Sequence, residues 1–356
     1  MAKIRIGILG ASDIAFRRFL PALKSVRTFE FAGVAVADYR EWGAGLDEKS
    51  YEPLLTAKRE KAQKFIDNYG GKIYVGYENL IWSEDVDAVY IPLPPSLHFR
   101  WCQEALSAGK HVLSEKPCTT SLKDTMELVD LAQTKGLALY ENYAFGLHRQ
   151  IFKIRELIEE GKIGELRLIR SAFGFPYRSA ADFRYDQKMG GGALLDCGGY
   201  VLKAVQLFTG GDVEVVTSVL HYTDRHDVDM YGSAVLIGKN QVEAQTASQI
   251  ASQIASQIAF GMDNSYKCEL EIWGSQACIF APRIFTPPAE METQIIVKGQ
   301  SEEIIKVMPD DQFAHAIEYF GSCIENPEAR ETAGKEILAQ SRLVDEMAAK
   351  NILRLS

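Results

Sequence analysis

The order of strand-like and helix-like segments changes partway along the chain, and this change constrains the fold more than any other feature. Up to about residue 136, short apolar runs alternate with helical segments. The runs lie at Ile4 to Leu9, Phe31 to Ala37, Ala88 to Ile91 and Val112 to Leu113. Runs that are apolar at nearly every position are typical of strands covered on both faces, as in a parallel sheet with crossover helices. This part predicts a doubly wound α/β domain.

The rest of the chain is dominated by strands. It begins with a strand-like run at Leu137 to Glu141, a helix at about 150–160 and a strand at 164–175. A helix at 193–208 follows, which we call glycine-framed because three glycines precede it and two lie within it. Further strands are expected at about 213–223, 230–237, 241–260, 266–273, 276–280, 292–298 and 302–307, and helices at 312–324 and 333–353. Strands without intervening helices predict a largely antiparallel sheet. We therefore expect two domains, an α/β domain over 1–122 and an α+β domain over 123–356.

Two segments stand apart from this pattern. Residues 39–56 form a long connection, which is either a surface excursion or a cover for a ligand. The tetrapeptide Ser-Gln-Ile-Ala occurs three times over residues 248–259. We favour a strand over a helix here, with Ile250, Ile254, Ile258 and Phe260 sharing one face with the serines. Its expected role is structural, in a sheet that packs against a partner subunit.

Composition excludes several classes of function. With Lys plus Arg at 39 and Asp plus Glu at 48, the net charge of −9 argues against nucleic acid or an anionic membrane as the main partner. No apolar run reaches the roughly 18 residues of a membrane span, and the first residues lack a signal-peptide pattern. The six cysteines include no Cys-x-x-Cys pair, so we expect a reduced, cytoplasmic protein. The His221 to Asp229 segment is rich in ligand-type side chains, but a turn explains it better than a metal site.

The first strand ends in a glycine turn that suits a dinucleotide. Gly10 permits the tight turn, a small Ser12 lets the backbone approach a pyrophosphate, and Ala15 permits close helix packing. The N–H groups at the start of the next helix then face the phosphates. The residues expected along the dinucleotide are Gly10, Ala11, Ser12, Asp13 and Ile14.

The end of the second strand carries the residues expected to choose the cofactor. Asp38 can accept hydrogen bonds from the adenosine ribose hydroxyls and repel a 2′-phosphate, which favours NAD. Arg40, two residues further on, leaves NADP open.

Candidate catalytic residues occur at two further places in the sequence. Glu115-Lys116-Pro117 follows the Val112 to Leu113 strand, at the sheet edge where doubly wound domains bind ligands. A lysine beside a cationic nicotinamide suits proton transfer or polarisation of a hydroxyl, and Pro117 in such a turn is often preceded by a cis bond. Asp196 and Tyr200 lie four residues apart on the glycine-framed helix, so they share a helix face. Glycines inside a helix, here Gly198 and Gly199, lower its stability by about 1 kcal/mol each relative to alanine and usually mark a close approach to another backbone or a ligand.

Together these motifs resemble the glucose–fructose oxidoreductase / inositol dehydrogenase / MocA family over nearly the whole chain. The resemblance rests on Gly7 to Ala15, the Ile91 to His98 segment, Glu115-Lys116-Pro117 and the Asp196…Tyr200 helix, in that order. It implies an N-terminal Rossmann domain, a C-terminal domain with an open, mostly antiparallel sheet, and a catalytic Lys116. It also implies a homodimer or homotetramer formed through the C-terminal sheet. The remaining residues expected near the cofactor are Pro92, Leu93, Pro94, His98, Glu115, Asn142 and Arg184.

Within the family, Tyr200 stands where many members have histidine, as in the sugar 3-ketoreductase and dihydrodiol dehydrogenase branch. Pro95 replaces a common asparagine. The expected activity is hydride transfer between NAD(P) and a hydroxyl or keto carbon of a sugar, with Lys116, Tyr200 and Asp196 as catalytic residues and no metal. Two alternatives remain on the same fold: a glycosidase that retains NAD and acts through transient oxidation at carbon-3, and a non-catalytic regulator that senses a ligand.

Overall fold

The chain forms two compact units that do not follow the sequence order throughout. The computed structural model describes residues 3–41, 47–210, 212–239 and 253–353. One unit comprises Met1–Asn142 with Phe313–Ile337, and the other Tyr143–Gln312 with Leu338–Ser356. The boundary expected after residue 122 falls inside the first unit, because the strand at Leu139–Glu141 pairs with the parallel sheet there. Helix α9 (Pro327–Ala349) contributes residues to both units.

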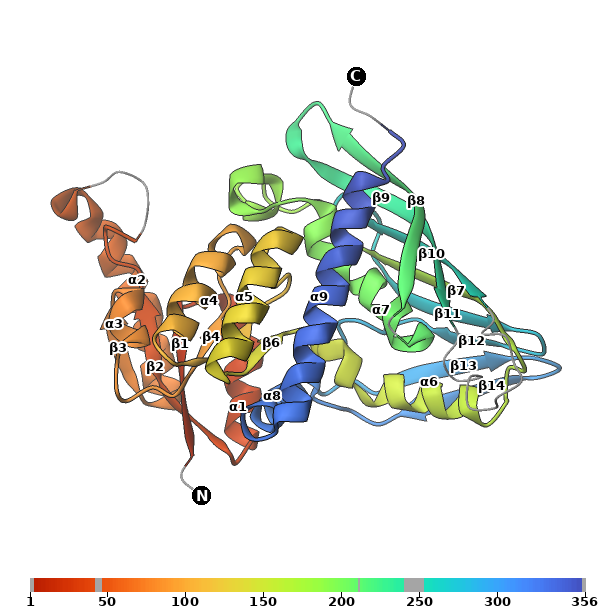
Figure 1. The fold of residues 1–356 in the computed structure, drawn as a ribbon, viewed down its shortest axis with the longest axis horizontal. Coiled ribbons are helices and arrows are strands. Elements are labelled where there is room, and N and C mark those ends of the chain that lie inside the picture. Colours follow the sequence, from red (N-terminus) through yellow and green to blue (C-terminus); the bar gives the residue numbers. More distant parts are fainter. Residues whose placement is uncertain (1–2, 42–46, 211, 240–252, 354–356) are drawn as a thin grey trace. The chain divides into compact units, whose positions relative to one another are not determined.

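The first unit is built on a parallel six-stranded sheet with the order β3-β2-β1-β4-β5-β6 (Figure 1). This is the order of a doubly wound dinucleotide-binding sheet, so the predicted α/β class is confirmed. The strands are β1 (Ile4–Leu9), β2 (Phe29–Val36), β3 (Lys72–Val75), β4 (Ala88–Ile91), β5 (His111–Ser114) and β6 (Leu139–Glu141). The helices are α1 (Leu20–Ser25), α2 (Glu48–Tyr69), α3 (Tyr77–Ile81), α4 (His98–Ser107), α5 (Leu122–Lys135) and α8 (Gln312–Glu325).

Local signals explain where several of these helices begin and end. The Ser121 hydroxyl accepts a hydrogen bond from Asp124 N at 3.1 Å and so caps the start of α5. Gly136 ends that helix in the left-handed conformation. Pro95–Leu97 forms a 3₁₀ turn, and α4 begins only at His98.

The long connection expected at 39–56 is only partly a loop. Helix α2 begins at Glu48, where the Asp47 carboxylate accepts a hydrogen bond from Ser50 N at 2.7 Å. Residues 42–46 lie outside the described part of the chain, so a role in covering a ligand stays a prediction.

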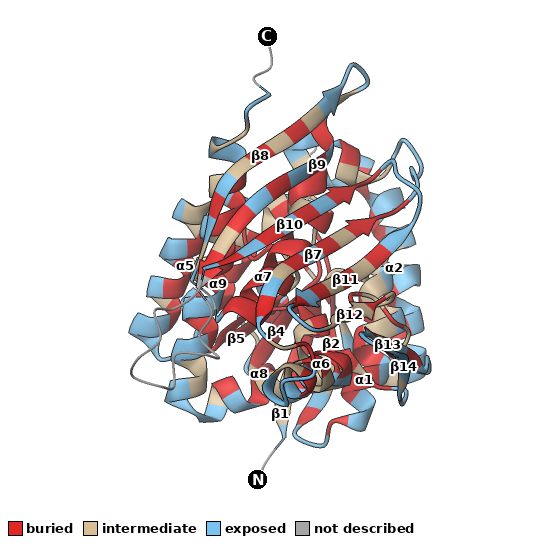
Figure 2. Cartoon of the chain, turned by 90° about the vertical axis from the view of Figure 1, so that its right-hand side faces the viewer, coloured by how far each residue is buried: buried red, intermediate tan, exposed pale blue. Residues whose placement is uncertain are grey.

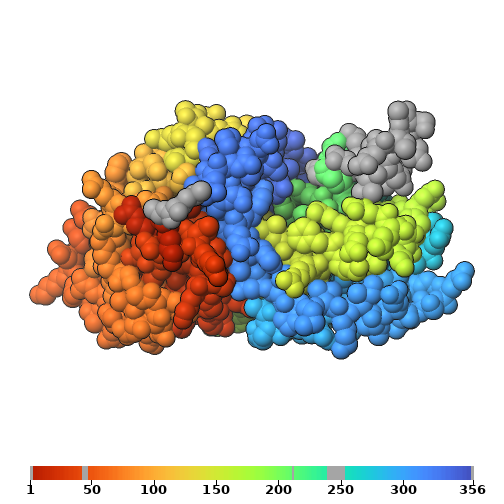
Figure 3. All heavy atoms as spheres, turned by 90° about the horizontal axis from the view of Figure 1, so that it is seen from below, coloured from red at the N-terminus to blue at the C-terminus, as the bar shows by residue number. Residues whose placement is uncertain are grey.

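The second unit carries an eight-stranded sheet with the order β14-β13-β12-β11-β7-β10-β9-β8. Only the pairing of β10 with β7 is parallel among the described strand pairs of this sheet, so the predicted antiparallel character is confirmed. The strands are β7 (Leu166–Gly174), β8 (Val213–Thr223), β9 (His226–Lys239), β10 (Gln253–Gly261), β11 (Lys267–Gly274), β12 (Cys278–Ala281), β13 (Thr293–Lys298) and β14 (Glu302–Val307). Helix α7 (Gly199–Thr209) packs on β7 and β10, and α6 (Arg149–Glu159) packs on β13, as the view of Figure 3 shows for α6.

The repeat segment is a strand where the structure describes it. In β10, Ile254, Ser256, Ile258 and Phe260 are buried while the Gln and Ala positions between them are exposed. This confirms the predicted division of faces; residues 248–252 lie outside the described part. Figure 2 shows the same alternation of buried and exposed positions along the neighbouring strands. One face of the sheet therefore forms the core, and the other is exposed.

Candidate active site

The turn after β1 has the geometry that a dinucleotide requires. Gly10 has a φ of +88°, and a Cβ there would lie 2.9 Å from a methyl carbon of Leu93. The Ser12 hydroxyl accepts a hydrogen bond from Ala15 N at 3.2 Å, which closes the first turn of the next helix. The close approach of Leu93 to Gly10 brings the predicted 92–94 segment to the dinucleotide turn. These residues fit a bound pyrophosphate.

The end of β2 holds a charged cluster at the expected ribose position. Asp38 Oδ1 accepts hydrogen bonds from Arg40 N (2.8 Å) and Glu41 N (3.0 Å), and its Oδ2 lies 2.9 Å from the Arg40 guanidinium. Burial acts to raise the pKa of Asp38, but the hydrogen bonds from Glu41 and Arg40 outweigh it and the pKa is lowered. Asp38 is therefore a carboxylate at neutral pH, and Arg40 is bound to it.

A second carboxylate in this cluster was not found from the sequence. The Glu41 side chain accepts hydrogen bonds from Asp38 N at 3.0 Å and from Tyr77 N at 2.8 Å. It therefore fixes the end of β2 against the start of α3. Its position three residues after Asp38 gives no signal by itself, since the partner at Tyr77 is distant in sequence.

The Glu115-Lys116-Pro117 turn is held by buried polar contacts. Glu115 accepts hydrogen bonds from Tyr90 Oη and Asn142 Nδ2, both at 2.7 Å. Burial raises the pKa of Glu115, and these hydrogen bonds offset part of that effect. The Lys116–Pro117 bond is cis, as expected. The predicted Asn142 thus supports the backbone next to Lys116.

His98 connects two of the predicted cofactor segments. It is fully buried, with Nδ1 2.7 Å from Pro117 O and Nε2 2.7 Å from Leu93 O. Burial lowers its pKa. Because both ring nitrogens face backbone carbonyls, His98 holds the Leu93 segment and the Pro117 turn together.

In the second unit, the glycine-framed helix starts with a π-helical segment, Leu194–Gly198, which α7 continues. The single helix expected over 193–208 is therefore irregular in its first part. A Cβ at Gly199 would lie 2.0 Å from Tyr143 Oη, and one at Gly198 would lie 3.3 Å from the Phe260 ring. The close approach predicted from the glycines is thus to aromatic side chains. π-helical segments of this kind are frequent at functional sites.

Asp196 is fixed by an arginine. Arg184 Nε lies 2.7 Å from Asp196 Oδ2, and Arg184 also pairs with Asp182 at 3.1 Å. Within the second unit, Arg184 is thus an ion-pair partner of the predicted catalytic carboxylate. Its predicted contact with the cofactor stays a prediction.

The Tyr200 ring lies among other aromatic rings. Centroid distances are 5.0 Å to Phe173, 5.4 Å to Tyr143, and 5.7 Å to both Phe145 and Phe285. Edge-to-face and tilted contacts of this kind favour one orientation of the ring. No local sequence pattern predicts this aromatic cluster, because its members come from four separate segments.

The helix start depends on Asp229 of β9, a second residue that sequence reasoning missed. Asp229 Oδ2 accepts a hydrogen bond from Leu194 N at 2.7 Å. A Cβ at Gly192 would lie 2.5 Å from Asp229 Oδ1, so the glycine makes room for this contact. Burial raises the pKa of Asp229 to about 6, against hydrogen bonds that lower it.

Replacing Asp229 with asparagine is expected to flatten part of the pH dependence of stability. Between pH 4 and 6 the folded protein keeps a proton that the unfolded chain has released, so this carboxyl lowers the free energy of unfolding as pH rises through that window. The free energy of unfolding falls by on the order of 3 kcal/mol over the whole of this window. Asparagine cannot ionise and retains the acceptor for Leu194 N. Urea unfolding from pH 4 to 7.5 should therefore show the variant gaining stability relative to wild type as pH rises. The exposed Asp227→Asn is the control, and equal pH profiles for wild type and Asp229→Asn would contradict the assignment.

The predicted site residues thus form two groups. The residues near the dinucleotide turn, with Lys116 and Asn142, belong to the first unit, whereas Asp196, Tyr200 and Arg184 belong to the second. Each group is held together by the contacts above, and the meeting of Lys116 with Tyr200 stays a prediction. In the described part of the chain, no three His, Cys, Asp or Glu side chains are arranged to hold a metal ion.

Comparison with known proteins identifies this combination of domains. Residues 4–143 match the model of an oxidoreductase family with an NAD-binding Rossmann fold, and residues 151–280 match a GFO/IDH/MocA C-terminal domain. The protein is an NAD(P)-dependent oxidoreductase that acts on a hydroxyl or keto carbon of a sugar or sugar derivative. The chain belongs to the Gfo/Idh/MocA family.

Several relatives match along almost the whole chain. A dTDP-3,4-didehydro-2,6-dideoxy-α-D-glucose 3-reductase from Actinomadura kijaniata is 36% identical over 96% of this chain and 94% of its own. Its counterpart from Saccharopolyspora spinosa is 35% identical over 96% of each. The crystal structure of KijD10, a 3-ketoreductase from Actinomadura kijaniata in complex with NADP and TDP-benzene, superposes with a TM-score of 0.85, 35% identity and 98% coverage of both chains.

Proposed function

We propose that the protein reduces the 3-keto group of a nucleotide-linked deoxy sugar. The observation that carries this proposal is the Tyr200 phenol in its aromatic cluster, four residues after an Asp196 that forms an ion pair with Arg184. A phenol supported in this way suits proton donation to a carbonyl oxygen. Relatives of 32–36% identity that act on dTDP-linked keto sugars support the substrate class.

The division of labour among the residues follows from their chemistry. NAD(P)H supplies the hydride to the carbonyl carbon when bound. Tyr200 donates a proton to the carbonyl oxygen, and the ammonium group of Lys116 stabilises the phenolate that this leaves and orients the substrate. Asp196, held in place by its ion pair with Arg184, accepts hydrogen bonds from sugar hydroxyls. Lys116 and Tyr200 can exchange the donor and orienting roles.

The test is turnover of a dTDP-linked 3,4-diketo-2,6-dideoxyglucose with NADH or NADPH, followed by loss of nicotinamide absorbance. We expect one reduced nicotinamide to be consumed for each sugar reduced. Cleavage of an aryl glycoside with no net change in nicotinamide would support the glycosidase alternative instead. Dinucleotide binding without turnover of any sugar in a broad panel would support the regulator.

For the cofactor, we propose a preference for NAD set by Asp38. Its carboxylate already binds the Arg40 guanidinium, and Glu41 adds a second negative charge nearby. This arrangement opposes the 2′-phosphate of NADP, although KijD10 was crystallised with NADP.

Replacing Asp38 with serine is expected to remove the repulsion between the Asp38 carboxylate and the 2′-phosphate of NADP. It also releases the Arg40 guanidinium to bind that phosphate. The ratio of kcat/KM for NADPH to that for NADH should rise by roughly tenfold or more, the effect of about 1.4 kcal/mol. Steady-state kinetics with both cofactors measures it. The exposed Asp67→Ser on α2 is the control, and an unchanged ratio in Asp38→Ser would contradict the role of Asp38.

We also propose that a second copy of the chain covers the exposed face of the eight-stranded sheet. In register on that face lie Trp273 (49% exposed), Leu168, Ala255 and Ile237, one on each of four adjacent strands. A row of apolar side chains across a sheet face is typical of an interaction surface.

Replacing Trp273 with glutamate is expected to dissociate the resulting dimer or tetramer into smaller species. Light scattering coupled to size-exclusion chromatography measures the change. Met126→Glu, at an exposed apolar position on α5 of the first unit, is the control. A monomeric wild-type protein would contradict the proposal.

The cellular location is a further proposal. All six cysteines are free thiols, which suits the reducing cytoplasm. Among the described residues, none of the helices combines the length and apolarity needed to cross a bilayer.

A further inference from the structure

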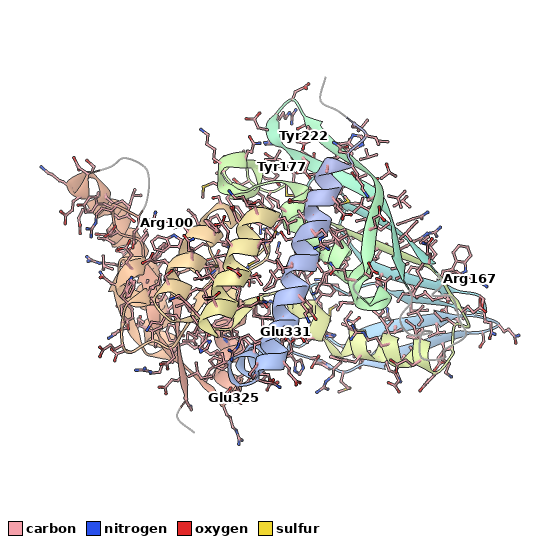
Figure 4. The ribbon with its side chains drawn as sticks, in the orientation of Figure 1. Arg100, Arg167, Tyr177, Tyr222, Glu325 and Glu331 are labelled. Atoms are coloured by element: carbon pink, nitrogen blue, oxygen red, sulfur yellow. The ribbon has the colours of Figure 1, made fainter. Side chains whose placement is uncertain are left out.

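A hollow lies in the second unit at the tip of the β8–β9 hairpin. Its volume is about 480 Å³, within the range of roughly 300–1,000 Å³ that is typical of small-molecule sites. The lining residues come from the loop after β7, from the hairpin and from the turn after β10: Tyr177, Thr223, Asp224, Arg225, His226, Met230 and Asp263. Figure 4 shows Tyr177 close to the hairpin strand that carries Tyr222. None of these residues takes part in the reaction described above.

One wall of the hollow is a rigid aromatic ring. Tyr177 stacks on the buried Tyr185, with ring centroids 4.5 Å apart and planes 17° apart. The Tyr177 hydroxyl also lies 3.2 Å from His226 Nε2. Tyr177 is nevertheless 40% exposed, so one face of its ring is supported while part of the ring is open to solvent. A ring fixed in this way suits stacking by a planar group of a ligand.

The polar side chains of the hollow match the rest of a nucleotide. Within the described part of the chain, the Thr223, Arg225 and Asp263 side chains have neither a hydrogen bond nor an ion pair. A carboxylate and a hydroxyl suit the N–H of a pyrimidine base and the sugar hydroxyls, and a guanidinium suits a diphosphate. The hollow thus offers stacking, hydrogen bonding and one cation for a phosphate.

At two places, a residue at the hollow is the direct neighbour in sequence of a residue that positions the candidate catalytic groups of the same unit. Tyr185 follows Arg184, which holds Asp196. Met230 follows Asp229, which holds the start of the helix that carries Tyr200. The hollow and the Arg184–Asp196 ion pair therefore lie at neighbouring positions of the chain in the second unit.

We propose that this hollow binds the pyrimidine nucleoside diphosphate portion of the substrate, with the base stacked on Tyr177. The proposal rests on the proposed function, because that function requires a nucleotide-linked sugar. It assigns Tyr177 as a residue that determines specificity for the carrier.

The test is binding of dTDP to the full-length protein by calorimetry, with saturating NAD⁺ present so that the dinucleotide site is filled. Tyr177→Ala is expected to weaken dTDP binding by roughly 5- to 100-fold, the range that follows from loss of one base-stacking contact. Tyr177→Phe keeps the ring and should bind dTDP nearly as well as wild type, which also shows that the loop still folds. Tyr222→Ala is the matched control. Tyr222 lies on the β8–β9 hairpin and is about as exposed as Tyr177, but it does not line the hollow.

Each result supports or overturns the assignment. No binding of dTDP by wild type, an unchanged affinity in Tyr177→Ala, or an equal loss in Tyr222→Ala would overturn it. Tyr177-dependent binding of dTDP without reduction of any keto sugar would leave the nucleotide site standing and contradict the proposed function. Turnover of the dTDP-linked sugar with a KM that Tyr177→Ala does not change would leave the function standing and overturn the site.

Discussion

Replacing Lys116 with alanine is expected to lower kcat for reduction by roughly 10²- to 10⁴-fold, the range for loss of one group in acid–base catalysis. The turn that carries Lys116 is fixed by Glu115, Asn142 and His98, so shortening the lysine leaves its backbone in place. The loss should therefore appear in turnover and not in folding. Steady-state kinetics and thermal unfolding of the variant measure the two effects separately.

The matched control for this prediction is Lys123→Ala on α5, an exposed lysine in the same unit. It should keep wild-type kinetics. Near-wild-type turnover of Lys116→Ala would contradict a catalytic role for that lysine. A loss of dinucleotide binding without any change in kcat would make Lys116 a binding residue instead.

Replacing Tyr200 with phenylalanine is expected to cause a loss of similar size, roughly 10²- to 10⁴-fold in kcat. Phenylalanine retains the ring that packs on Phe173 and the neighbouring aromatic side chains, so only the hydroxyl is removed. The pH dependence of kcat should also change, because the titrating proton donor is missing. Rates measured across the neutral to alkaline range test both expectations.

Tyr222→Phe removes an exposed hydroxyl from the same unit and should leave the rate and its pH dependence unchanged. If Tyr200→Phe kept both the wild-type rate and the wild-type pH profile, the phenol would not be the proton donor. A large loss in both Tyr200→Phe and Lys116→Ala, with the double variant no worse than either one, would indicate that the two groups act as a unit.

Local patterns were sufficient to predict most of the fold. β1 and the Gly10 turn follow from an apolar run, one glycine and the small residues after it, and the structure places them as expected. The even period of the Ser-Gln-Ile-Ala repeat predicts the buried and exposed faces of β10 correctly. Such features depend on neighbours in sequence, so the sequence carries them directly.

Features that depend on distant partners could not be predicted. Asp229 holds Leu194, 35 positions earlier, and neither residue signals the other. Likewise, the rings that approach Gly198 and Gly199 belong to Phe260 and Tyr143, each more than 50 positions away in the chain. A domain boundary at residue 122 also misses the pairing of β6 with β5 and the return of α8 to the first unit, since neither feature has a local signal in the sequence.

We propose that Lys116 of one unit and Tyr200 of the other serve the same reacting oxygen. A crystal structure of the complex with a nicotinamide cofactor and a dTDP-linked substrate analogue tests it most directly. We predict the Lys116 Nζ and Tyr200 Oη atoms within hydrogen-bond reach, about 2.6–3.2 Å, of the substrate oxygen or of each other. A separation too wide for even one bridging water, with the substrate bound, would contradict the account.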